Sequence, residues 1–288
     1  MIWFVLRRLG AFLATMLATS LLVYWLLAST PETGDIGLVR WMGLVLTGSF
    51  GVGREGPVGQ LLAGALAVTL PLTLLALLLA VVLGALLGLM AARRPHAIAD
   101  RLIRASAATG TAVPAFWLGM LLAVPLANGL HWLPAGGFVP WWQSVGGAAL
   151  SLVLPAITLA LPAAAALCLK TRDSAVAMRS SPWFAATLAR GQTAQAAWRG
   201  ENLRVVALAL LRPIANQAAG LVAGAVVIEN TFYLPGLGRL LLDAVAARDP
   251  ATVRGAIVAL VFLGAGAMFL IRISALWLDP RIRAEASE

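Results

Sequence analysis

Residues that could carry chemistry are sparse in this chain of 288 residues. Its two histidines, His96 and His131, lie far apart, and Cys168 is its one cysteine. The sequence therefore offers no Cys/His metal cluster, no internal disulfide and no Ser/His/Asp set for nucleophilic catalysis. It also lacks the Gly-x-x-x-x-Gly-Lys-Ser/Thr loop that binds nucleotide phosphates. We therefore expect no catalytic residues, no metal site and no cofactor bound by this chain.

One acidic residue stands out because it lies inside an apolar stretch. Glu229, followed by Asn230, ends the apolar run 205–231. A carboxylate costs about 2.5–3.5 kcal/mol at the centre of a membrane helix and less near the interface. Two interpretations stay open: a hydrogen bond at the helix end, or a charge that lines a gate at the outer end of a pathway.

The loop after this stretch holds four further charges, Arg239, Asp243, Arg248 and Asp249. Opposite charges in one loop can contact an external protein, and a solvated loop is an equal alternative.

A polar region, 172–204, contains a short segment with helix signals at both ends. Ser181 suits the N-cap, Pro182 suits the first helical position, and Gly191 suits the end. The spacing predicts one apolar face made of Trp183, Phe184, Thr187 and Leu188. Such a helix either lies on the lipid surface or inserts into a groove on a partner protein.

The elements that position these residues are membrane helices. Hydrophobic residues make up 61% of the chain and charged residues only 11%, against about a quarter in soluble domains. The runs 56–92 and 105–169 contain no charge, and about 20 apolar residues cross a bilayer. The sequence predicts a single all-α transmembrane domain, 1–288, with six spans: 3–28, 60–92, 99–127, 147–171, 205–231 and 254–278.

The distribution of basic residues orients these spans. With both ends in the cytosol, sixteen of the 21 Lys and Arg residues fall on the cytosolic side. The net charge of +9 is thus explained by the positive-inside rule rather than by nucleic acid. The first apolar stretch is longer than a signal-peptide core, so we expect an uncleaved first helix.

Two further features shape the predicted bundle. Segment 29–58 is expected to be an outer loop, within which 38–50 is apolar but too short to span. Small residues spaced by four, Gly84/Gly88 and Gly220/Gly224, favour close helix packing.

Taken in order, several stretches resemble the inner-membrane permeases of bacterial ATP-binding cassette (ABC) importers. The similarity is greatest to the first permease of the dipeptide, oligopeptide and nickel branch. The stretches are FVLRRLGAFLATMLATSLLVYWLL near the start, GSFGVGREGPVGQLL at 48–62, VPAFWLGMLLAVPLANGLHWLPAGGF at 113–138, LVLPAITLALPAAAALCLKTRDS at 152–174, VVIENTFYLPGLGRLLLDAVAARDPATVRG at 226–255 and LDPRIR at 278–283.

The resemblance implies a type I ABC importer permease fold in the bacterial inner membrane. It also implies that the short cytosolic helix couples this chain to an ATP-binding subunit. The coupling positions would be Trp183, Phe184, Ala185, Ala186, Thr187, Leu188 and Gly191. Two such subunits would bind ATP and Mg²⁺, and a second homologous permease and an external substrate-binding protein would complete the assembly.

We therefore predict a non-catalytic permease subunit that moves a peptide, a nickel or metal chelate, or a similar small solute. In this assembly Glu229 and Asn230 are candidates for an outer gate, and the loop 239–249 is a candidate contact for the binding protein. The alternative is a self-sufficient secondary transporter or channel. That alternative needs ionisable groups in the middle of the spans, and the sequence has almost none there.

Overall fold

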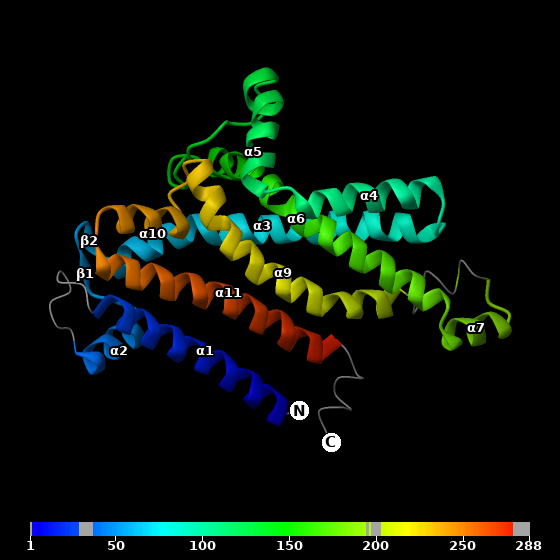
Figure 1. Ribbon diagram of the computed structural model, residues 1–288, viewed down its shortest axis with the longest axis horizontal. Helices are drawn as coiled ribbons and strands as arrows, with labels where there is room; N and C mark the ends of the chain where they lie inside the picture. Colours follow the sequence, from blue (N-terminus) through cyan, green and yellow to red (C-terminus); the bar gives the residue numbers. More distant parts are fainter. Residues whose placement is uncertain (1, 29–36, 194–195, 197–202, 279–288) are drawn as a thin grey trace.

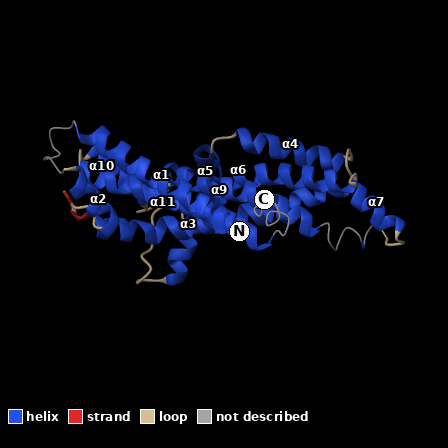
Figure 2. Cartoon of the chain, turned by 90° about the horizontal axis from the view of Figure 1, so that it is seen from below, coloured by secondary structure: helices blue, strands red, loops and turns tan. Residues whose placement is uncertain are grey.

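The computed structural model describes residues 2–28, 37–193, 196 and 203–278, and helices dominate it (Figures 1 and 2). A two-stranded antiparallel hairpin, β1 (Val52–Gly53) and β2 (Gly56–Pro57), precedes the third helix. The helices are α1 (Ile2–Ala28), α2 (Leu38–Thr47), α3 (Val58–Arg93), α4 (Ile98–Ala112), α5 (Ala115–Ala123), a π-helix (Val124–Gly129), α6 (Val145–Arg179), α7 (Pro182–Ala189), α9 (Leu203–Thr231), α10 (Leu237–Ala246) and α11 (Pro250–Leu278).

Five helices in the described residues are long and apolar enough to cross a membrane: α1, α3, α6, α9 and α11. A sixth span results if α4 and the helical residues 115–129 count as one broken element. The predicted all-α membrane architecture is thus confirmed.

The prediction of one continuous helix over 99–127 is wrong. Val113 and Pro114 are both extended, and the two halves meet at 106°. Pro114 has no amide hydrogen for the helical ladder, and its ring disfavours the helical conformation of the preceding residue. As a result α4 lies along α3 and α6, while α5 turns away from the line of α4 and projects from the bundle, with one side in contact with α6 and α9 (Figure 1).

The centre of the bundle is the contact between α3 and α6, the two longest helices. A Cβ at Gly84 would lie 2.8 Å from Ala164 O, and a Cβ at Gly88 would lie 2.6 Å from Cys168 O. These two glycines therefore permit the close approach of the two backbones, as their spacing predicted. Of the second predicted pair, in α9, only Gly224 packs closely against α6, whereas Gly220 faces open space.

The helices α9, α11 and α1 complete the bundle in that order beside α6. The Phe12 ring of α1 stacks on Phe269 of α11 with 5.3 Å between centroids. At the other end of the pair, Arg254 Nη2 donates to Leu27 O at 3.2 Å. The pairing of low numbers on α1 with high numbers on α11 means that these helices run antiparallel (Figure 1).

The two ends of the bundle carry different elements. One end, here the hairpin end, gathers α2, the β-hairpin and α10, while α7 extends beyond the opposite end, here the α7 end (Figures 1 and 2). The helix α2 lies within the predicted loop 29–58. It is held to α1 by Trp41, whose Nε1 donates to Ser20 Oγ at 3.0 Å.

Two predicted boundaries need correction. The fourth predicted span ended at 171, but α6 continues to Arg179 because no Gly or Pro interrupts the chain before Pro182. The sixth predicted span began at 254, but α11 begins at Pro250, which suits a first helical position. Positions 194–195 and 197–202 of the predicted polar loop lie outside the described residues.

Candidate functional sites at the two ends of the bundle

The helix predicted at 182–191 is confirmed as α7. Ser181 Oγ caps it by accepting a hydrogen bond from Phe184 N at 3.2 Å, and Pro182 occupies the first helical position. Gly191 follows the helix with φ of 85°, a left-handed conformation that glycine adopts without steric cost. The two caps make this a discrete helix of eight residues.

The side chains of α7 divide between an inward and an outward face. Thr187 is buried, and its hydroxyl donates to Trp183 O at 2.9 Å and accepts from Arg190 Nη2 at 3.2 Å. Trp183 and Phe184 are half-buried, whereas Leu188 is exposed. The single apolar face predicted from spacing is thus split, because Leu188 turns away from the buried Thr187. The exposed residues of α7 include Ala185, Ala186 and Leu188.

A charged pair that the sequence analysis missed joins α6 to α4 near α7. Arg172 donates to Asp100 through Nε at 3.0 Å and Nη2 at 2.9 Å, and the Asp100 side chain is fully buried. Asp100 also accepts from His96 N at 2.8 Å, before the first turn of α4. In the sequence, Asp100 could be recognised only as an acidic residue in the first turn of a helix. Its partner Arg172 lies 72 positions away, so no local pattern reveals the pair.

A second bond ties the same part of α6 to α3. Arg179 Nη1 donates to Arg93 O, at the end of α3, at 2.9 Å. Because α6 is unbroken between the two arginines, α3, α4 and α6 are joined at the end that carries α7. A displacement of α7 would therefore act on three helices together.

At the hairpin end, Glu229 is fully buried and is part of the internal structure. Its carboxylate accepts from Thr69 Oγ1 at 2.6 Å, Gly238 N at 2.7 Å and Arg239 N at 3.4 Å. The last two amides belong to the first turn of α10, so Glu229 supplies the N-terminal cap that Gly236 cannot provide.

This arrangement favours the helix-end alternative for Glu229, and the outer-gate interpretation stays a prediction. Thr69 extends the network, because its Oγ1 also accepts from Leu237 N at 2.8 Å. A Cβ at Gly236 would overlap the Glu229 carboxylate, so glycine is needed at that position. Asn230, the residue after Glu229, is exposed, and its role at an outer gate stays a prediction.

The four charged residues of the predicted contact loop differ in their surroundings. Arg239 and Asp243 form a loose pair on α10, with Nε and Oδ2 3.6 Å apart, and Asp243 is exposed. Arg248 is exposed in a left-handed turn. Asp249 is buried within this chain, and its contact with a binding protein stays a prediction.

Asp249 instead ties the β-hairpin to the start of α11. Burial by itself raises the pKa of this carboxyl, but its hydrogen bonds outweigh that effect and hold the pKa below the ordinary value. The donors are Thr252 Oγ1 at 2.6 Å, Arg54 N at 2.8 Å and Thr252 N at 3.3 Å. The side chain is thus an N-cap that also fixes the hairpin turn.

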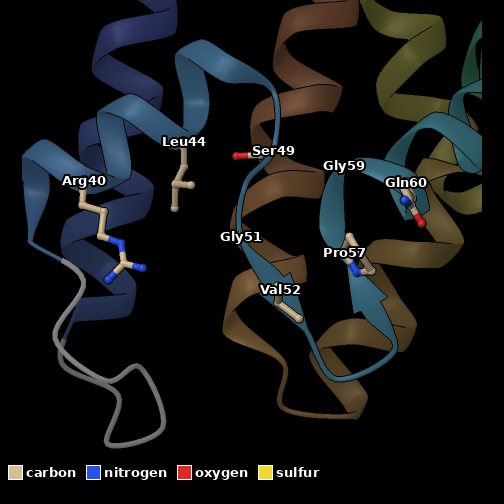
Figure 3. A pocket seen from close by; sticks show the side chains of 8 residues that line it. All are labelled: Arg40, Leu44, Ser49, Gly51, Val52, Pro57, Gly59 and Gln60. Carbon is tan, nitrogen blue, oxygen red and sulfur yellow. The ribbon is translucent and has the colours of Figure 1, made fainter.

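An open pocket of about 660 Å³ lies at the hairpin end between α2, the β-hairpin and the first turn of α3 (Figure 3). Its wall is mostly apolar, and Arg40 and Gln60 contribute the longest polar side chains. The lining residues are Arg40, Leu44, Ser49, Gly51, Val52, Pro57, Gly59 and Gln60. Among the described residues no group of three His, Cys, Asp or Glu side chains could hold a metal ion.

Comparison with known proteins gives one consistent result. The model of a family described as "binding-protein-dependent transport system inner membrane component" matches residues 84–284, well over half of the chain. A probable peptide ABC transporter permease of Sinorhizobium fredii is 29% identical, over 97% of this chain and 99% of its own length. An oligopeptide transport system permease of Bacillus subtilis is 29% identical (85% and 79%), and a nickel import system permease of Staphylococcus aureus is 27% identical (85% and 72%).

Proposed function

The chain belongs to the binding-protein-dependent transport system inner membrane component family, and we propose that it forms one half of the translocation pathway of an ATP-driven importer. It is a multi-pass permease subunit of an ABC transporter in the inner membrane. The single structural observation that carries the proposal is α7: a short, doubly capped helix at the end of the longest spanning helices, with small side chains facing outward.

We propose that α7 docks in a cleft on an ATP-binding subunit. The exposed Ala185 and Ala186 leave the helix backbone accessible to close contact, and Leu188 supplies an apolar anchor. ATP and Mg²⁺ bind to two such subunits, whose closure displaces α7. The continuous α6, bonded to α4 through Asp100 and to α3 through Arg93, carries this displacement into the membrane.

A second, homologous permease is the other proposed half of the pathway. The support is α5, which contacts α6 and α9 on one side and projects from the bundle (Figure 1). Its other side carries apolar side chains that are exposed in the part of the chain that the structure describes. Phe116 is 40% exposed, Trp117 49% and Met120 53%. Packing against a neighbouring permease buries these side chains, and the bend at Pro114 directs the helix toward that neighbour.

A substrate-binding protein is proposed to dock at the hairpin end. The exposed charges Asp243 and Arg248 on and after α10, together with the pocket beside Arg40, present a mixed polar and apolar surface there. The buried Glu229 and Asp249 networks hold this surface in place.

The proposed cargo is a peptide, a nickel or metal chelate, or a similar small solute. Relatives similar to this chain are named for peptide, oligopeptide and nickel transport. Binding of each ligand class to the cognate binding protein, measured by calorimetry, distinguishes these cargoes.

Reconstitution tests the driving force. Proteoliposomes with this chain, its paired permease, the ATP-binding subunits and the binding protein should accumulate solute only when ATP is supplied. The chain alone, under an imposed proton or sodium gradient, should not transport. Gradient-driven uptake by the chain alone would overturn the proposal in favour of a secondary transporter.

A further inference from the structure

Arginines on three helices meet at one level of the bundle, on the side away from the β-hairpin. The helices α1 and α11 are antiparallel, and Phe12 of α1 stacks on Phe269 of α11. One turn further along each helix, in the same direction, lie Arg8 on α1 and Arg272 on α11. The stack therefore places these two arginines beside each other. Arg272 Nη2 also donates to Asn216 Oδ1 of α9 at 3.0 Å. The three helices are therefore in contact at this level (Figure 1).

The third arginine of the group lies one turn from that contact. Arg212 precedes Asn216 by four residues on α9, so the two share a helix face. Arg7 adds a fourth arginine, because it is next to Arg8 on α1. We call Arg7, Arg8, Arg212 and Arg272 the arginine tier.

The arginine tier lies at the depth of a membrane interface. Twenty residues separate Arg8 from the end of α1 at Ala28, which corresponds to about 30 Å at 1.5 Å per residue. On α11, eighteen residues separate Arg272 from Arg254 at the hairpin end, about 27 Å. Both lengths match the thickness of the hydrocarbon core, so the tier is level with the lipid headgroups of one leaflet.

Two members of the arginine tier have no acidic partner within the part of the chain that the structure describes. Among the ion pairs of the described residues, none includes Arg212 or Arg272, and Arg272 binds only a neutral amide. Two guanidinium groups at this depth without a carboxylate attract an anion. The planar guanidinium binds a phosphate with two parallel hydrogen bonds.

Apolar surface continues from the arginine tier toward the hairpin end. Leu13 on α1 is 55% exposed, and Phe262 on α11 is 57% exposed although its ring also contacts Phe12. An acyl chain whose headgroup is held by the arginines would lie along these side chains. A site with a cationic head and an apolar tail region fits a lipid rather than a free anion.

We propose that the arginine tier binds the phosphate of an anionic glycerophospholipid, with Arg212 and Arg272 as its main ligands and Arg7 adding positive potential. A phosphatidylglycerol headgroup carries one net negative charge and suits the site. Phosphatidylcholine adds a fixed cation that the arginines repel. The bound lipid would join α1, which has few buried contacts, to α9 and α11. This inference does not depend on the importer function.

Native mass spectrometry of the full chain in detergent tests the proposal. The chain is incubated separately with phosphatidylglycerol, with phosphatidylcholine of the same acyl chains, and with inorganic phosphate. Wild-type protein should retain phosphatidylglycerol in preference to phosphatidylcholine and should retain no phosphate. With about 1 kcal/mol per basic residue at a membrane surface, Arg212→Gln should weaken phosphatidylglycerol binding about 5-fold and Arg212→Gln/Arg272→Gln about 30-fold.

A matched control separates a site from general attraction. Arg94→Gln/Arg101→Gln removes two exposed arginines near the connection of α3 to α4 and should change binding less than 2-fold. Near-ultraviolet circular dichroism checks that each variant is folded, and Arg→Lys variants replace any that is not. The proposal would be overturned if the control lost as much phosphatidylglycerol binding as the tier variants. It would also be overturned if wild-type protein retained both lipids equally, or retained phosphate alone.

Discussion

Removing the Glu229 carboxylate should destabilise the whole bundle rather than open a gate. The carboxylate accepts bonds of 2.6 Å from Thr69 Oγ1 and 2.7 Å from Gly238 N, and its exposure is 0%. Glu229→Ala leaves these buried donors without a partner, at about 1–3 kcal/mol each, and creates a cavity. We expect a loss of about 3–5 kcal/mol in the free energy of unfolding.

A milder variant sharpens the prediction. In Glu229→Gln the amide oxygen can still accept from Gly238 N, while its NH₂ group can donate to the Thr69 hydroxyl oxygen. The expected cost is about 1–2 kcal/mol, since the hydrogen bonds are kept but are no longer charge-assisted. Asn230→Ala, next along the chain and exposed, is the control and should change stability by less than about 0.5 kcal/mol.

The stability changes can be measured by the labelling of a buried cysteine. Cys168 is the one cysteine and is 1% exposed, so a maleimide dye reacts with it only when the bundle opens. When opening equilibrates faster than labelling, each 1.4 kcal/mol changes the labelling rate about tenfold. Glu229→Ala should thus label roughly 100-fold faster or more than wild type. A labelling rate equal to that of Asn230→Ala would refute the capping role.

Three further predictions follow from the packing and the buried charges. Gly88→Ala should destabilise the protein by about 1–3 kcal/mol through overlap with α6, whereas Gly220→Ala, facing open space, should be neutral or stabilising by up to about 1 kcal/mol; equal thermal shifts would contradict this. Because the pKa of Asp249 is depressed, its stabilisation is complete above the unfolded pKa of about 3.9 and is lost as the pH falls through the folded value. Asp249→Asn should therefore show a smaller drop in melting temperature between pH 6 and pH 3, and an unchanged drop would argue against the cap. Arg172→Met, which leaves Asp100 buried and unpaired, should cost about 3–5 kcal/mol, and adding Asp100→Asn should recover part of it; no recovery would disprove the pairing.

Local sequence signals predicted the parts of the fold that depend on neighbouring residues. The apolar runs gave the positions of the spanning helices, because about 20 apolar residues are needed wherever a helix crosses. The capping residues Ser181, Pro182 and Gly191 placed α7 because each acts within one turn of the helix end. Gly84 and Gly88 predicted a close helix contact, although the spacing did not identify α6 as the partner.

Features that depend on distant partners were missed or misassigned. The bend at Pro114 was not foreseen because proline within membrane helices is often tolerated, and its effect depends on what packs around it. Glu229 was a candidate for an outer gate and Asp249 for an external contact because each carboxylate accepts a hydrogen bond from a residue far away in sequence, Thr69 and Arg54 respectively. A charged residue of this kind can be a functional group or a buried hydrogen-bonding group that joins two elements, and only the fold distinguishes the two.

Cross-linking at α7 tests the central claim most directly. In a Cys168→Ser background, Ala186→Cys places a thiol on the outward face of α7, and Trp142→Cys places one on an exposed residue in the loop before α6. In membranes that contain the complete transporter, a bifunctional maleimide should join Ala186→Cys to the ATP-binding subunit, and Trp142→Cys should give no such product. Leu188→Asp added to Ala186→Cys should reduce the product and uncouple ATP hydrolysis from transport. Absence of the Ala186 product, together with unchanged ATP-driven transport after deletion of residues 182–191, would contradict the account.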